Sequence, residues 1–384
     1  MKIKNFKVDD WLNTREHLAQ YNLSSSCCKP VTFRELLELA GIGTEDFFKE
    51  LIDSPLDYGN PLGSPRLKKS VTGLYTEIVT EDMVICTHGG TGANAIVYQA
   101  LIEKGDNVVC ILPNYQLNYS LPEALGAEIR IFTCDENSNY TVDLKKIKSM
   151  IDENTKLITL ANPNNPTGYA LSKNELEQLA KMAREVQAYI VCDEIYRGLD
   201  ETYMYSICDL YEKGICTSSV SKVFSIPGSR VGWIVTRDLR LKETLMKFRS
   251  YNSLCEGPIN EWIASIVLEN KEVFYRRNRR IADEGRAILY QWLKEQPHFK
   301  AACDSKSAIA LIYYDFDIPA EKLANELFEK KGVLVCHGGC FEQEHCFRVG
   351  YGMGDTEKLQ QSFALIADYV EELDEQGRIK EIVE

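Results

Sequence analysis

Two apolar stretches enclose the polar segment Ser219-Val-Ser-Lys-Val-Phe-Ser-Ile-Pro-Gly-Ser-Arg230. Residues 214–219 and 231–236 are predicted to be buried strands, so the segment joins two strands of one sheet. A lysine held between buried strands is costly unless it has a chemical role, and lysine amines form imines with aldehyde cofactors. Lys222 is therefore a candidate for covalent catalysis. The alternative is a solvated lysine in a surface loop.

The same segment carries groups that suit an anion. Ser219 and Ser221 stand close to Lys222, and Arg230 follows that lysine by eight residues. Hydroxyl groups and a guanidinium bind phosphate through charge-assisted hydrogen bonds. We therefore expect these three side chains to hold a small anion such as a phosphate.

The composition is that of an ordinary soluble globular protein. The chain has 384 residues, of which 45% are hydrophobic and 26% charged, enough for a large core in two domains or in one domain with a lobe. The formal net charge of −13 argues against nucleic acid as a partner, because phosphate backbones bind basic surfaces. Local basic pockets for small anions remain compatible with this charge.

No stretch indicates export or a membrane. The N-terminus lacks an apolar core of signal-peptide length, and no apolar run approaches a membrane span. The thirteen cysteines are scattered, so we expect free thiols in the cytoplasm. Cys336, His337 and Cys340, followed by His345 and Cys346, could ligate zinc. They lie on a predicted connection between two strands, however, and we expect no metal.

Strands and helices alternate between residues 83 and 235. Strands are predicted at residues 83–87, 107–112, 128–133, 157–161 and 189–192. Helices are predicted at residues 94–103, 143–151 and 173–186. This alternation predicts an α/β fold with a mainly parallel central sheet flanked by helices. Ligands of such sheets bind at the carboxyl ends of the strands, where the unusual residues of this chain fall.

The pattern changes after about residue 250. Helices are predicted at residues 256–270, 271–294 and 356–373, and strands at 308–314, 333–336 and 346–351. The acidic tail after Leu373 is predicted to be solvated helix. We therefore expect a large domain at residues 46–250 and a smaller α+β domain made from both chain ends, residues 1–45 and 251–384.

Two segments that follow strands offer further ligand groups. Gly89-Gly-Thr-Gly-Ala93 joins a strand to a helix, whose first N–H groups could bind phosphate. Its spacing differs from the dinucleotide fingerprint, and a tight turn is the alternative.

The second segment is Asn162-Pro-Asn-Asn-Pro-Thr-Gly168. Pro166 and Gly168 would fix Asn165 at a strand end, where the Asn165 amide can donate a hydrogen bond to a phenolate oxygen. A plain β-to-α turn is the alternative.

A carboxylate ends the strand at residues 189–192. Asp193 could pair with a protonated ring nitrogen and keep a pyridine ring electron-poor. Tyr196 could add a hydrogen bond to the phenolate oxygen of the same ring. The alternative for Asp193 is a structural helix cap.

These motifs follow one another in a fixed order along the chain. The order is Tyr58, the glycine segment, an aromatic residue after Pro113, Asn-Pro-x-Asn-Pro-Thr-Gly, Asp-x-x-Tyr, Ser-x-Ser-Lys and an arginine eight residues later. This order resembles the class I/II aminotransferases, which are fold-type I enzymes that use pyridoxal 5′-phosphate (PLP). The resemblance extends from about Leu23 to about Val370. It implies transfer of an α-amino group between an amino acid and a 2-oxo acid.

The resemblance also implies a role for each matching residue. Lys222 would form the aldimine with PLP and then move the proton. Asp193 would bind the ring nitrogen, Asn165 and Tyr196 the phenolic oxygen, and Tyr115 would stack on the ring. The residues implied for the phosphate are Gly90, Thr91, Ser219, Ser221, Arg230 and, from the neighbouring subunit of a homodimer, Tyr58. Those implied for the substrate are Arg348, which would grip the α-carboxylate, and Asn165.

The N-terminal segment departs from many relatives. The region that carries a glycine near the substrate carboxylate in those proteins corresponds here to Leu23-Ser-Ser-Ser-Cys-Cys28, so Ser25 is a candidate substrate contact. With Trp11, the stretch from Thr32 and Thr87-His-Gly, this segment is similar to the capreomycidine synthase branch. A β-elimination lyase or an amino-acid cyclase on the same fold is therefore the second hypothesis. A binding or regulatory module is the third, but it would have no need of a proton-moving lysine.

Overall fold

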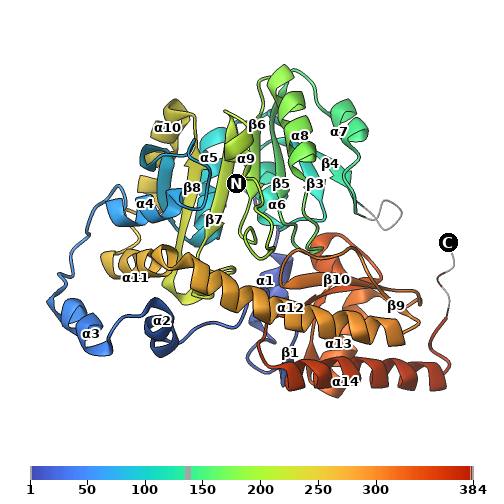
Figure 1. The fold of residues 1–384 in the computed structure, drawn as a ribbon. Coiled ribbons are helices and arrows are strands. Elements are labelled where there is room, and N and C mark those ends of the chain that lie inside the picture. The colour runs from blue at the N-terminus through green and yellow to red at the C-terminus, as the bar shows by residue number, and fades with distance from the viewer. Residues whose placement is uncertain (1, 135–139, 381, 383–384) are drawn as a thin grey trace.

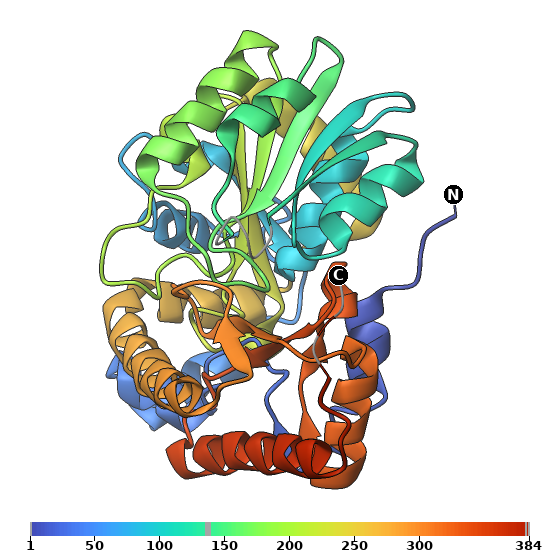
Figure 2. The same cartoon turned by 90° about the vertical axis from the view of Figure 1, so that its right-hand side faces the viewer.

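The computed structural model describes residues 2–134, 140–380 and 382. It contains a large seven-stranded sheet with helices on both faces and a smaller region built around a second sheet (Figure 1). A view turned by 90° shows the smaller region below the large sheet, with the long helix α14 (Thr356–Glu375) along its outer side (Figure 2). This architecture confirms the predicted fold class.

The large sheet is mainly parallel, as predicted. Its strands in spatial order are β2 (Val84–His88), β8 (Val231–Thr236), β7 (Gly214–Ser219), β6 (Tyr189–Asp193), β5 (Thr155–Ala161), β3 (Asn107–Leu112) and β4 (Glu128–Thr133). Strand β8 runs antiparallel to both of its neighbours, and the other pairs are parallel. The carboxyl ends of β5, β6 and β7 therefore meet at one edge in the middle of the sheet.

Side chains of the central strands pack alternately into two apolar layers, one on each face of the sheet. Ile190 and Cys192 of β6 belong to one buried cluster and Val191 to another, because successive side chains of a strand point to opposite faces. On the Val191 side, the cluster includes residues from helices α5 (Gly89–Leu101), α6 (Leu117–Leu125) and α10 (Leu239–Asn252). On the Ile190 side, it includes residues from α4 (Pro65–Thr72), α7 (Leu144–Met150), α8 (Lys173–Glu185), α9 (Ile207–Leu210) and α11 (Pro258–Glu269).

Both chain ends contribute to the smaller region. Its antiparallel sheet has the order β12 (Cys336–His337), β13 (Cys346–Gly350), β10 (Ile309–Tyr314) and β9 (Phe299–Ala301). Near the N-terminus, β1 (Tyr21–Asn22) pairs in parallel with β11 (Val333–Leu334). The remaining elements of the described chain are α1 (Lys7–Asn13), α2 (Phe33–Ala40), α3 (Thr44–Asp53), α12 (Lys271–Glu295), α13 (Ala320–Lys331), η1 (Glu81–Met83), η3 (Pro227–Ser229) and η4 (Gly338–Phe341). The division at residues 45 and 250 stays a prediction.

The short helix α1 is fixed at both sides. The side chain of Gln116 accepts a hydrogen bond from the Lys7 N–H at 2.8 Å and donates one to the carbonyl of Asn5 at 2.8 Å. On the other side, the Trp11 indole N–H donates to the carbonyl of Val335 at 2.8 Å. Figure 1 shows α1 between the large sheet and the smaller region. Helix α1 is thus built into the body of the protein.

Local signals of the sequence are confirmed in part. Thr32 and Glu35 form the expected capping box at the start of α2. The predicted helix at residues 94–103 begins earlier, because the glycine segment itself forms the first turn of α5. The predicted helical tail is wrong, since α14 ends at Glu375 and Gly377 is left-handed. Arg378 instead folds back onto Glu326.

None of the helices within the described ranges is both long enough and apolar enough to cross a membrane.

A buried ion pair supports the link between α10 and α11. Arg249 contacts Glu256 at 2.8 Å, and both side chains are almost fully excluded from solvent. Glu256→Ala leaves a buried guanidinium unpaired, so we expect a loss of ~3–5 kcal/mol in the free energy of unfolding. The measurement is the midpoint of thermal unfolding at one protein concentration.

Glu269→Ala is the matched control for this prediction. Glu269 pairs with Arg66 at 2.7 Å, but both side chains are exposed, so the expected loss is below about 1 kcal/mol. Equal midpoints for the two variants would contradict the assigned role of the buried pair.

Candidate active site

A cavity of about 210 Å³ lies at the carboxyl ends of the central strands. Its walls come from α1, the segment around Ser26, the first turn of α5, the ends of β5 and β6, the segment after β7, and Arg348 on β13. The large sheet, the N-terminal segment and the smaller region therefore enclose one cavity. The predicted site residues that line it are Gly90, Thr91, Tyr115, Asn165, Asp193, Tyr196, Ser221, Lys222, Arg230 and Arg348.

Lys222 points toward the N-terminal segment. Its ammonium donates hydrogen bonds to Ser26 Oγ at 2.8 Å and to Cys27 Sγ at 3.3 Å. Burial lowers the pKa of this amine, but the negative charges that Cys27 and Tyr196 acquire on deprotonation raise it, and the net pKa lies above the usual value. These surroundings favour a charged Lys222, which has to lose that proton before it can act as a nucleophile.

Asp193 is a buried carboxylate with fixed orientation. Asn94 donates to Asp193 Oδ2 at 2.8 Å, and the Ile195 N–H donates to Oδ1 at 3.1 Å. Thr217 in turn donates to Asn94 Oδ1 at 2.5 Å. Burial still raises the pKa of Asp193 above its usual value. A buried carboxylate of this kind is stabilised by a cationic N–H donor, which a protonated ring nitrogen would supply.

The other end of the cavity suits a phosphate. The first turn of α5 presents unpaired backbone N–H groups at Gly90 and Thr91. Gly89 has φ +70°, and a Cβ on it would come within 2.6 Å of Arg230 Nη2. Glycine at this position therefore lets the guanidinium reach the helix start. Ser221 completes a set of neutral and cationic donors around the same space.

Arg348 keeps one donor free for a ligand. It lies on β13 with 2% of its surface exposed, and it donates to Asn165 Oδ1 at 2.9 Å and to the Ser24 carbonyl at 2.8 Å. Its buried Nε has no hydrogen-bond partner among the described residues. An unpaired guanidinium donor at a cavity wall is suited to a carboxylate.

Two tyrosines contribute ring surfaces to the cavity. Tyr115 packs against Phe6 with ring centroids 5.0 Å apart, and burial, followed by the charge of Asp9, raises the pKa of Tyr115 to about 12. Tyr196 is 1% exposed. The Tyr115 phenol is therefore a neutral hydrogen-bonding group at physiological pH.

Three predicted residues do not line the cavity. Ser219 lies behind Ser221 and accepts a hydrogen bond from its N–H at 3.2 Å. Tyr58 is 69% exposed and is not among the residues that line the cavity. Ser25 is replaced at the cavity wall by Ser26, because the backbone of residues 23–25 packs along β13, with the Gly350 N–H bonded to the Leu23 carbonyl.

Several cavity residues were missed by the sequence motifs. Asn94 supports Asp193 from the second turn of α5, and its partners are 99 and 123 residues away in the sequence. Ser26 and Cys27 contact Lys222 across a similarly long separation. Asp9 lines the cavity from α1. The N-cap of α1 is Phe6, three residues before Asp9.

The cysteine and histidine cluster lies beside the site. His337 Nε2 is 3.2 Å from Cys340 Sγ; His337 ends β12, and Cys340 lies in η4 between β12 and β13. Within the described ranges, no three histidine, cysteine or acidic side chains are grouped so that they could hold a metal ion.

Comparison with known proteins identifies the family. Residues 49–364 match the family described as aminotransferase class I and II. The chain belongs to this family. A solved PLP-dependent aminotransferase from Streptococcus suis is 35% identical and superposes with a TM-score of 0.93, covering 97% of this chain and 99% of the other.

Other relatives differ in their reactions. Capreomycidine synthase from Streptomyces vinaceus is 26% identical over 366 residues, covering 94% of this chain and 92% of the relative. A probable aspartate aminotransferase from Methanocaldococcus jannaschii is 28% identical over 302 residues, covering 71% and 80% of the two chains. The family and the fold are therefore shown, whereas the relatives do not share one reaction.

The cofactor of this family is PLP, and the cavity fits it. The groups that would hold it are the helix start and Arg230 for the phosphate, Asp193 for the ring nitrogen, Tyr115 for the ring face and Lys222 for the aldehyde. The glycine that makes room for Arg230 and the buried, oriented carboxylate are features that this cofactor requires.

Covalent capture tests the place of Lys222. Borohydride reduction of the protein mixed with PLP should attach the cofactor to Lys222, because only a lysine in the cavity can reach a bound aldehyde. Peptide mass mapping is the measurement. Lys213→Ala, a change of a half-buried lysine that does not line the cavity, should leave the labelling intact, and Lys222→Ala should abolish it. Labelling of another lysine in the wild type would refute the assignment.

Proposed function

We propose that the protein is a PLP-dependent aminotransferase that moves an α-amino group between an amino acid and a 2-oxo acid. The observation that carries the proposal is the convergence of Lys222, Asp193 and Arg348 on one cavity. Arg348 and Lys222 are separate donors on opposite elements, so one can hold a carboxylate while the other acts at the neighbouring carbon.

Arg348 and Asn165 orient the substrate. The free Nε of Arg348, together with an Nη that can exchange its partner, would receive the α-carboxylate in a forked arrangement. This fixes the Cα–H bond relative to Lys222. Orientation of this kind contributes to catalysis by removing the entropy cost of aligning the reacting groups.

Lys222 supplies the acid–base chemistry. In its uncharged form the Lys222 Nζ would accept the proton from the substrate Cα and later donate it again, acting first as general base and then as general acid. Ser26 and Cys27 hold the amine within the cavity during this exchange. PLP supplies an electron-accepting ring when bound, and Asp193 with Asn94 keeps the proton on its nitrogen.

A homodimer completes this proposal. Four side chains around residues 52–62 are strongly exposed, namely Ile52 at 80%, Leu56 at 90%, Tyr58 at 69% and Leu62 at 59%. Exposed apolar surface of this extent is typical of an interaction face. A second copy that covers it would bring Tyr58 to the neighbouring phosphate. We also propose a cytoplasmic location, since all thirteen cysteines are free thiols.

A lyase or cyclase is the second candidate. The observation that favours it is the match to capreomycidine synthase over 94% of this chain. A solved PLP-dependent cyclase, OrfR, shares the fold with a TM-score of 0.87 at 21% identity. Both reactions begin with removal of the α-proton, which the same Lys222 would perform.

A half-reaction distinguishes these functions. The protein loaded with PLP is mixed with single amino acids in the absence of a 2-oxo acid, and the visible spectrum is recorded. Transamination predicts loss of the initial band, release of one 2-oxo acid per site and return of the band when a 2-oxo acid is added. A band that persists through many turnovers, with ammonia or a cyclic product accumulating, would establish the second candidate instead.

The carboxylate role of Arg348 is tested by Arg348→Ala. Loss of charge-assisted hydrogen bonds worth about 1.5–3 kcal/mol should raise KM for the amino acid about 10–150-fold. The measurement is KM for an active amino acid and for the corresponding amine without a carboxylate. The amine should be little affected. An unchanged KM for the amino acid would count against this role.

A further inference from the structure

One charged group in the cavity has no role in the chemistry described above. The charged side chains that line it are Lys222, Arg230, Arg348, Asp193 and Asp9. The first four are matched to the cofactor or to the α-carboxylate of the substrate. Asp9 remains, and its carboxylate has no hydrogen bond or ion pair with any residue that the structure describes.

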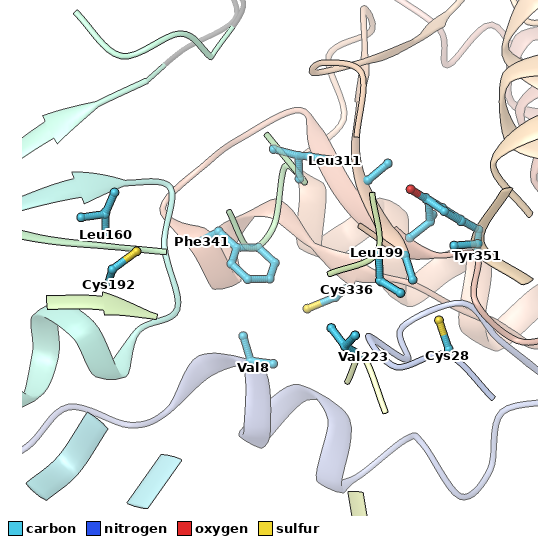
Figure 3. Close-up of a cluster of buried hydrophobic side chains, with 14 of the residues drawn as sticks. Val8, Cys28, Leu160, Cys192, Leu199, Val223, Leu311, Cys336, Phe341 and Tyr351 are labelled. Atoms are coloured by element: carbon cyan, nitrogen blue, oxygen red, sulfur yellow. The ribbon is translucent and has the colours of Figure 1, made fainter. Parts of the chain in front are cut away.

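Asp9 is held at the cavity by a fixed helix. Its neighbours Val8 and Leu12 line the same cavity, and Val8 is 4% exposed. In Figure 3 the side chain of Val8 extends from α1 toward Phe341 and Cys336 of the smaller region. Asp9 itself is exposed, so it lies at the cavity mouth while its charge acts inside. The contacts of Gln116 and Trp11 described above keep this helix in place.

The charge of Asp9 interacts with the titratable groups around the space for the cofactor. Burial and the adjacent Asp10 raise the pKa of Asp9, and Lys222 lowers it. Asp9 also helps to raise the pKa of Tyr115. Lys222 is therefore the cation whose charge acts on Asp9 among the groups of the cavity.

Other cations of the same helix region have their own partners. Lys7 pairs with Glu342 at 2.8 Å. Arg15 lies 3.9 Å over the Trp11 ring and donates to Asn325 at 3.0 Å. Neither lines the cavity, so among the described residues no cation of this helix region pairs with Asp9, and its carboxylate is available to a bound cation.

We propose that Asp9 binds the side-chain cation of the substrate, so that the protein acts on amino acids with a terminal ammonium or guanidinium group. This inference rests on the proposed function. Val8, Leu12 and Ile195 provide apolar surface for the aliphatic part of such a side chain. Among the described lining residues, no further arginine or lysine is available for a second carboxylate, which disfavours aspartate and glutamate.

Equilibrium binding tests the proposal without turnover. Lys222→Ala loaded with PLP is titrated with ornithine, with norvaline as a neutral analogue, and with glutamate, using calorimetry. Ornithine should bind at least about tenfold more tightly than norvaline, and glutamate should bind most weakly. Adding Asp9→Asn should weaken ornithine about tenfold, leave norvaline within about twofold and strengthen glutamate. The affinities of lysine and arginine, measured in the same way, then show which side-chain length the site prefers.

Asp10→Asn is the matched control. Asp10 is the next residue of α1 and is also exposed, but it does not line this cavity, so its change should leave all three affinities within about twofold. Retained PLP binding and thermal midpoint show that the Asp9 variant is folded. Equal affinities of ornithine and norvaline for the parent protein, or equal effects of the two variants, would overturn the proposal.

The outcome is separable from that of the proposed function. If the half-reaction shows elimination or cyclisation, the binding preference for ornithine should persist, because it depends on Asp9 and not on the later steps. Suppose instead that neutral amino acids are transaminated and that ornithine binds no more tightly than norvaline. The proposed function is then supported, and the proposed role of Asp9 is wrong.

Discussion

The buried guanidinium of Arg348 joins three parts of the chain that are far apart in sequence. It belongs to β13, contacts Asn165 after β5, and donates to the carbonyl of Ser24. A buried cation is unstable unless its donors are satisfied, so these contacts require the two sheets and the N-terminal segment to come together in one arrangement. In this arrangement Arg348 lines the cavity and its Nε has no hydrogen-bond partner among the described residues.

The large sheet supplies the opposite wall through its strand order. Strands β5, β6 and β7 are neighbours, so the residues that follow them share one edge. Close backbone approach is also necessary, because a Cβ at Gly232 would collide with the backbone of Gly89. The phosphate end and the lysine end of the cavity are thereby set by backbone geometry. Side chains such as Asn94 then orient the single buried carboxylate between them.

The sequence predicted the residues whose position follows from the ends of elements. Lys222, Asp193 and Asn165 each follow a strand, and a parallel sheet brings such positions together. Asn94 was missed because its partners come from strands remote in sequence. Ser25 was preferred to Ser26 because the register of an extended segment on β13 depends on packing that composition does not reveal. Asp9 was missed as well, since nothing local shows that α1 faces a cavity.

The pairing of β1 with β11 has a consequence for the order in which the protein is made. Residues 21–22 leave the ribosome early, but their partner strand at residues 333–334 is among the last segments to be synthesised. The seven-stranded sheet is complete by residue 236 and can form first. The N-terminal segment must then wait, with Trp11 and Leu23 unburied, until the C-terminal strands arrive. The cavity therefore closes late in the synthesis of each chain.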